Sequence, residues 1–157
     1  MRCTLLVLLF LTFSNGFSQI SDSLSVSIQL DNIVKDYPNR NFQNTASLNA
    51  CADYIFREFS QYTDDVSFQK YDANGIEYKN VIARFGPENS EKIIVGAHYD
   101  VCGNQDGADD NASGVVGLIE IARMLKDQKL KKQIEVVAYT LEEPPYFRSE
   151  KMGSYVH

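Results

Sequence analysis

The sequence predicts an α/β fold of three layers, α/β/α, in which helices cover a mainly parallel sheet that carries an edge hairpin. Two observations predict this class. The segments 92–98 and 134–141 are largely apolar runs, a composition typical of strands buried on both faces. Between them, residues 111–129 place apolar side chains at helical spacing. A strand, a helix and a second strand in this order form a right-handed crossover, which makes the two strands parallel.

The earlier elements follow from the same kinds of pattern. Apolar residues at helical spacing predict one helix over about 24–36 and a second over about 45–62. Apolar residues that alternate with polar ones on both sides of Asn74-Gly75 then predict the hairpin, over 66–85. This dipeptide favours a hairpin because it tolerates the positive φ angles of a two-residue turn.

The first 19 residues are expected to be a secretory signal peptide. Arg2 precedes an apolar run from Leu5 to Leu11, and small and polar residues follow it. This run is much shorter than the ~20 residues of a membrane-spanning helix, so we expect cleavage and no stable membrane insertion. The mature chain, residues 20–157, is then expected to be one domain that is secreted or periplasmic.

The charge of the chain argues against nucleic acid as a partner. Removing Arg2 leaves 14 of the 15 basic residues against 21 acidic ones, a net charge near −7, without a basic stripe. Because such a surface repels phosphate groups, we expect no nucleic-acid binding. Cys51 and Cys102 remain after cleavage. Export permits a disulfide between them, and two ordinary buried thiols are the alternative.

The segment that follows the strand 92–98 has the composition of a metal site. Residues 96–114, GAHYDVCGNQDGADDNASG, contain one His, four Asp and two Asn between an apolar strand and an apolar helix. Unpaired charges at the end of a buried element are costly, and a multivalent cation would relieve that cost. Ligands of open parallel sheets bind outside the carboxyl ends of the strands. Glu142 and Glu143 directly follow the strand 134–141, so they are expected at the same edge of the sheet as this segment.

The spacing of these residues suggests how they divide the chemistry. His98 and Asp100 lie two residues apart on a strand, so Asp100 can accept the second imidazole N–H of a metal-bound His98. The adjacent Glu142 and Glu143 point in different directions, so one can bind metal while the other handles protons.

Asp109 and Asp110 lie at the amino end of the next helix, which favours anionic side chains, and spacing alone does not choose between them.

Two other kinds of site are excluded, a calcium-binding EF-hand and a serine catalytic triad. An EF-hand register through this loop puts Cys102 first and Ser113 last, where Asp and Glu are required. A serine triad needs a nucleophile turn such as G-x-S-x-G, and the sequence contains none.

At these positions the chain resembles the M28 family of zinc aminopeptidases and carboxypeptidases. The family's signature has the form G-x-H-x-D, then G-A-D-D-N-A-S-G, then a strand that ends in Glu-Glu. Here these motifs stand at 96–100, 107–114 and 141–143. The resemblance covers about 80–157 and implies a zinc-exopeptidase-like fold, of which residues 20–157 form the amino-terminal part.

The resemblance also implies a peptide substrate and a co-catalytic pair of zinc ions. His98 would bind one zinc ion, Asp109 would bridge the two ions, and Glu143 would bind the second. Glu142 would be the general base, which takes a proton from the attacking water and returns it to the leaving amine. Asp100 would be the carboxylate behind His98.

The chain departs from the family in one respect. Family members supply a further Asp and a further His downstream of the Glu-Glu strand, and His157 follows too soon to be that His. Three protein ligands are few for two zinc ions, so we expect a truncated chain that is inactive by itself. Under this assignment Asp110 only shapes the loop.

Two alternatives to a peptidase remain: a glutaminyl-peptide cyclotransferase on the same fold, and a non-catalytic binding domain. The sequence leaves three questions open: whether the enzyme is an aminopeptidase or a carboxypeptidase, what its oligomeric state is, and whether it binds zinc rather than manganese or cobalt.

Overall fold

The computed structural model describes residues 20–157, and the expected signal peptide, residues 1–19, lies outside the described residues. Between residues 20 and 157, no helix combines the length and the apolar content needed to cross a membrane. The elements, in chain order, are α1 (Ser23–Asp36), α2 (Thr45–Phe59), β1 (Val66–Ala73), β2 (Ile76–Phe85), β3 (Lys92–His98), a π-helical turn (Ala108–Ala112), α3 (Ser113–Leu125), β4 (Gln133–Tyr139) and α4 (Gly153–Val156).

The hairpin predicted in the first half of the chain is confirmed, and a side-chain cap marks the start of the helix before it. The side chain of Asn44 caps α2 by accepting the backbone N–H of Ser47 at 3.3 Å. Asn74 and Gly75 join β1 to β2 with φ angles of 59° and 82°. Both angles are positive, as a two-residue hairpin turn requires. The predicted hairpin therefore forms at one edge of the sheet, in the strand order β1-β2-β4-β3.

The sheet is mixed, which corrects the expectation of a mainly parallel one. β3 and β4 run parallel, as the crossover predicts, but β2 pairs antiparallel with the other edge of β4 from Val81 to Phe85. The hairpin pairing of β1 with β2 is also antiparallel. Apolar patterning identifies which segments are strands, whereas the partner at each strand edge depends on packing between distant segments.

β3 is less buried than its composition suggested. Ile93 and Ile94 are 45% and 50% exposed, because β3 is the outermost strand of the sheet in the described residues. In the central strand β4, by contrast, Val136, Val137 and Ala138 are fully buried. An apolar run therefore predicted the strand correctly but not its position in the sheet.

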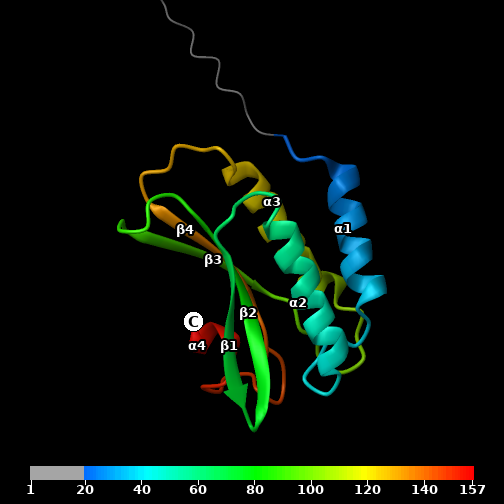
Figure 1. Ribbon diagram of the computed structural model, residues 1–157. Helices are drawn as coiled ribbons and strands as arrows, with labels where there is room; N and C mark the ends of the chain where they lie inside the picture. Colours follow the sequence, from blue (N-terminus) through cyan, green and yellow to red (C-terminus); the bar gives the residue numbers. More distant parts are fainter. Residues whose placement is uncertain (1–19) are drawn as a thin grey trace, which may run out of the picture.

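The core lies between one face of the sheet and the helices α1, α2 and α3, which Figure 1 shows on one side of the strands. On the other face, the side chain of Gln69 in β1 donates to the carbonyl of Val156 in α4 at 3.5 Å. The three predicted layers are thus present, although α4 alone represents the second helical layer among the described residues. The core residues on the covered face include Ile33, Leu48, Ile55, Val81, Ala83, Val115, Ile119, Val136 and Ala138.

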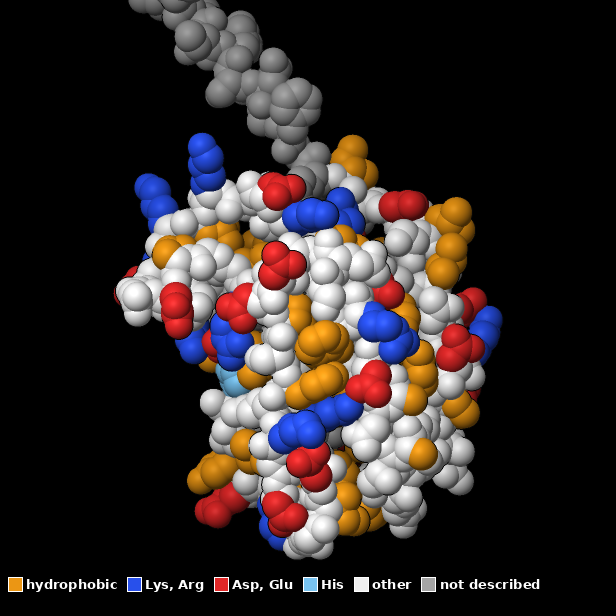
Figure 2. Space-filling model, viewed as in Figure 1, with side chains coloured by type: hydrophobic (Ala, Val, Ile, Leu, Met, Phe, Trp, Pro, Cys, Tyr) orange, Lys and Arg blue, Asp and Glu red, His pale blue; other side chains and the backbone are white. Residues whose placement is uncertain are grey.

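Charged side chains of both signs are interspersed on the face shown in Figure 2 rather than gathered by sign. Apolar side chains also protrude along α1 in that view, where Leu24 and Ile28 are 67% and 51% exposed. Cys51 is buried in α2 and Cys102 lies in the loop after β3, and both are free thiols. Burial raises the pKa of the Cys51 thiol to about 12, as expected for an unreactive core cysteine.

Candidate active site and metal centre

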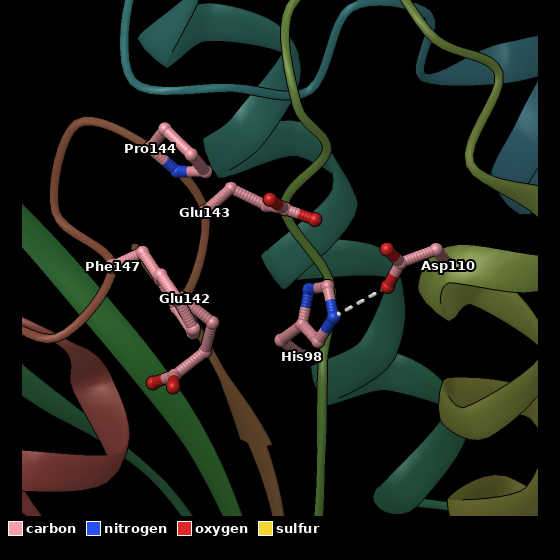
Figure 3. A pocket seen from close by; sticks show the side chains of 6 residues that line it. All are labelled: His98, Asp110, Glu142, Glu143, Pro144 and Phe147. Atoms are coloured by element: carbon pink, nitrogen blue, oxygen red, sulfur yellow. Dashed lines mark hydrogen bonds and ion pairs between the residues drawn. The ribbon is translucent and has the colours of Figure 1, made fainter.

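A cavity of about 450 Å³ opens at the carboxyl ends of β3 and β4. The two strands are parallel with His98 opposite Tyr139, so the segments that follow them begin at the same edge of the sheet. The backbone N–H of Tyr99 donates to the carbonyl of Tyr139 at 2.9 Å, which continues the pairing beyond β3. Figure 3 shows the residues that line the cavity: His98, Asp110, Glu142, Glu143, Pro144 and Phe147.

Three of these residues could hold a metal ion. His98, Asp110 and Glu143 each offer one ligand atom, and these atoms all lie within 4.8 Å of one another. Nε2 of His98 is 2.9 Å from Oδ1 of Asp110, the contact drawn in Figure 3. One imidazole and two carboxylates are a donor set that suits zinc and neighbouring divalent metals. The chemistry of the cluster therefore fits the metal that the motifs imply.

The electrostatics of the cluster also favour a cation. Burial raises the pKa of Glu143, and the nearby charge of Asp110 raises it further. Burial alone would lower the pKa of His98, but its hydrogen bonds to Asp100 and the charge of that residue raise it to about 9. Carboxylates crowded in this way are stabilised in their ionised form by a bound divalent cation.

Asp100 connects the two halves of the site. It is 2% exposed, and its carboxylate accepts the backbone N–H groups of Glu142 at 3.2 Å and of Glu143 at 3.0 Å. Nδ1 of His98 lies 3.1 Å from the Asp100 carbonyl and 3.5 Å from its carboxylate. Asp100 thus lies beside Nδ1 of His98, with its backbone carbonyl nearer than its carboxylate, and holds the Glu-Glu backbone beside the imidazole.

The structure brings Asp110, and not Asp109, to His98 and Glu143. The backbone explains this placement. Asp110 (φ −117°, ψ 89°) and Asn111 (φ −139°, ψ 42°) both leave helical geometry, so regular helical spacing does not predict where their side chains point. The assignment of the bridging role to Asp109 therefore has no support in this geometry. No spacing in the sequence signals such a local departure.

Glu142 lines the same cavity but makes different contacts. Figure 3 shows its carboxylate directed away from His98, Asp110 and Glu143. Both of its oxygens accept from Ser154: Oε1 from the backbone N–H and Oε2 from the hydroxyl, each at 2.7 Å. The adjacent glutamates therefore diverge as predicted, with Glu143 in the cluster and Glu142 outside it.

The loop after Glu143 forms an apolar wall of the cavity. The backbone N–H groups of Tyr146 and Phe147 donate to the Glu143 carbonyl at 3.0 and 3.2 Å. The ring of Tyr146 is only 8% exposed and packs edge-on against Phe42 and Tyr78 at 5.7 and 6.3 Å. The neighbouring Phe147 is 55% exposed and lines the cavity, so an anchored loop presents an aromatic ring beside the polar cluster.

Arg40 is a residue of the site that sequence reasoning missed. Its side chain is fully buried, and it donates to the carbonyls of Tyr99 at 2.8 Å, Asp106 at 2.8 Å and Gly107 at 2.9 Å. Burial lowers the pKa of the Arg40 guanidinium. Gly107 has φ of 62°, and a Cβ there would collide with Val101 and Arg40. Arg40 therefore holds the start and the end of the loop that leads to Asp110, although its polar sequence context resembles that of an exposed arginine.

Replacing Arg40 with Met is expected to lower the free energy of unfolding of the full-length protein by about 3 kcal/mol or more. The buried carbonyls of Tyr99 and Gly107 would lose their donor, as would the partly buried carbonyl of Asp106, and each such loss at a buried group costs ~1–3 kcal/mol. Urea titration measures the change. The matched control is Arg57→Met, at an exposed arginine of α2, where we expect a change within about 0.5 kcal/mol. Equal effects of the two variants would contradict the role of Arg40.

Comparison with known proteins gives this geometry a context. The family model of peptidase family M28 matches residues 80–154, the part of the chain that contains β3, the π-helical turn, α3 and β4. Among curated proteins, YfbL of Escherichia coli (strain K12) is 44% identical over 126 residues, which are 75% of this chain and 39% of that protein. The chain thus spans well under half the length of this relative.

Solved structures with this fold include two kinds of enzyme. A leucine aminopeptidase precursor from Bacteroides thetaiotaomicron is similar with a TM-score of 0.69 and 26% identity, over 82% of this chain and 51% of that one. Glutaminyl cyclase from Porphyromonas gingivalis is similar with a TM-score of 0.70 and 29% identity, over 85% of this chain and 51% of that one. The chain spans about half the length of either structure.

Proposed function

We propose that this chain, which belongs to peptidase family M28, is part of a metal-dependent peptidase that acts as an exopeptidase, of the aminopeptidase type, with two zinc ions. The observation that carries the proposal is the convergence of His98, Asp110 and Glu143 within 4.8 Å, beside a cavity at the strand ends. Similarity to a leucine aminopeptidase precursor supports the exopeptidase type. The substrate would be a peptide.

In this proposal the metal ligands and the general base are different residues. His98, Asp110 and Glu143 would hold the metal, with Asp110 taking the bridging place first assigned to Asp109. Bound zinc supplies Lewis acidity and a water that is activated near neutral pH. Glu142 lines the same cavity and, once its carboxylate turns toward the metal, would accept a proton from the attacking water and pass it to the leaving amine.

The full-length protein would complete the site. Zinc sites normally draw three or four ligands each, so three protein ligands are few for two ions. The similar solved structures are about twice as long as the part matched here. We therefore propose that a further Asp and a further His come from outside residues 20–157. We also propose export to the periplasm or the medium, on the signal-peptide pattern of residues 1–19.

Glutaminyl-peptide cyclisation is the second candidate function. One observation favours it: the glutaminyl cyclase of P. gingivalis is as similar in structure as the aminopeptidase precursor, with TM-scores of 0.70 and 0.69. The two reactions share the fold but differ in product. Hydrolysis releases an amino acid, whereas cyclisation of an amino-terminal Gln releases ammonia and shortens no peptide.

Chelator treatment of the full-length protein tests the proposal. We expect aminoacyl and peptide substrates to be hydrolysed, a metal chelator to abolish hydrolysis, and added zinc to restore it, because the activated water depends on the metal. Product release is followed by chromatography. Hydrolysis that persists in chelator would rule out the metal mechanism. Cyclisation of an amino-terminal Gln peptide without hydrolysis would favour the second candidate.

A further inference from the structure

We propose that the ring of Phe147 forms one wall of the pocket that receives an apolar side chain of the peptide substrate, on a residue that flanks the scissile bond. Phe147 would thus be a specificity-determining residue. The preferred substrates would carry a large apolar side chain, such as that of Leu or Phe, at this place. The inference rests on the proposed function and names its substrate class.

Phe147 lies beside the residues that would carry out the reaction. It lines the same cavity as His98 and Glu143, and it belongs to the loop that follows the two glutamates (Figure 3). The cavity volume of about 450 Å³ is within the range of small-ligand pockets in proteins. A peptide whose scissile carbonyl reaches the metal cluster brings the side chains on either side of that bond near the ring.

The exposed apolar surface of Phe147 differs from the rest of the cavity wall. The ring is 55% exposed, and apart from Pro144 the other lining residues are His, Asp and Glu. Other large apolar side chains that are exposed in residues 20–157, such as Leu24 and Ile93, lie outside the cavity. Removing apolar surface from water is favourable, so an apolar substrate side chain gains free energy by covering the ring. A charged side chain would instead lose hydration there.

The loop holds the ring in place relative to the metal cluster. The backbone N–H groups of Tyr146 and Phe147 both donate to the carbonyl of Glu143, one of the proposed metal ligands. The Tyr146 side chain is buried, and its hydroxyl accepts from Nδ2 of Asn74 at 3.2 Å. The guanidinium of Arg148 lies over the Phe147 ring, with Cζ 5.1 Å from the ring centroid. A wall that is restrained in this way loses little conformational entropy when a substrate binds.

The alternative is that Phe147 packs against another part of the full-length protein. The two roles have different consequences for a variant that lacks the ring. Loss of a pocket wall changes the choice among substrates, whereas loss of a packing contact affects all substrates alike.

The test measures kcat/KM of the full-length protein for two series of peptides. The first residue is Ala, Leu or Phe in one series, and the second residue is varied in the same way in the other, so the series distinguish the two sides of the scissile bond. We expect the wild-type protein to favour Leu or Phe over Ala by about 10-fold or more in one series. Phe147→Ala should reduce this preference about 10-fold, because apolar contacts discriminate between substrates by such factors. Phe147→Leu, which keeps an apolar side chain, should retain most of it.

Leu24→Ala is the matched control, since it removes an exposed apolar side chain of α1 that lies outside the cavity. This variant should keep the wild-type preference. The inference is overturned if the wild-type protein shows no preference for large apolar residues in either series, if Phe147→Ala keeps the preference, or if Phe147→Ala lowers kcat/KM equally for every peptide. Failure of the proposed function looks different, since the wild-type protein would then lack chelator-sensitive hydrolysis, and both proposals would fall together.

Discussion

Replacing Asp110 with Asn is expected to lower kcat/KM of the full-length enzyme by about 10³-fold or more and to reduce its zinc content. The Asp110 carboxylate lies 2.9 Å from Nε2 of His98 and within the cluster that includes Glu143. A neutral amide at position 110 removes one negative charge from the cluster and weakens the binding of the metal. The electrostatic contribution of the metal to catalysis is worth several kcal/mol. Steady-state kinetics and metal analysis of the purified variant measure the two effects.

Asp109→Asn is the matched control for this prediction. Asp109 is adjacent, carries the same group and is exposed, but it lies outside the cluster of ligand atoms. We expect this variant to retain zinc and most of the activity. If Asp109→Asn loses zinc while Asp110→Asn retains it, the assignment made from the family's motif is right and the cluster in the structure does not represent the metal site.

Replacing Glu142 with Gln is expected to lower kcat by about 10²- to 10⁴-fold, the range typical of a lost general base. The amide has nearly the same shape and can still accept hydrogen bonds through its oxygen, but it cannot take a proton. Because Glu142 lies outside the cluster of ligand atoms, zinc content and KM should change little. Measurement of kcat, KM and bound zinc in the full-length protein checks this expectation.

Glu143→Gln provides the contrasting variant, since Glu143 offers a ligand atom to the cluster. We expect this change to lower zinc content along with activity. If instead Glu142→Gln loses zinc and Glu143→Gln keeps it, the roles of the two adjacent glutamates are exchanged.

Much of the site could be predicted from the sequence because its motifs follow strands. His98 ends β3, and Glu142 and Glu143 follow β4. Parallel strands that are neighbours in a sheet bring their carboxyl ends together, so recognising the crossover was enough to place these residues around one cavity. Asp100 also lies beside His98, although β3 ends at His98 and Asp100 therefore stands just beyond the strand to which the two-residue period applies.

The choice between Asp109 and Asp110 could not be made in this way. Two adjacent carboxylates have the same chemistry, and which one reaches His98 depends on the φ and ψ angles at Asp110 and Asn111. Those angles belong to a loop that Arg40 holds from another part of the chain, through its contact with Gly107. A pattern of residue types contains no information on such a contact.

The amino-acid sequence by itself determined the α/β class, the hairpin at Asn74-Gly75 and the gathering of one imidazole and several carboxylates at the strand ends. These features depend on local periodicity and on the chemistry of short motifs. Only the tertiary structure decided that β2 rather than another parallel strand pairs with β4, that Asp110 enters the cluster, and that Ser154 binds Glu142. The physical reason is the same in each case: hydrogen bonds and steric fit between distant segments select one arrangement among several that the sequence pattern permits.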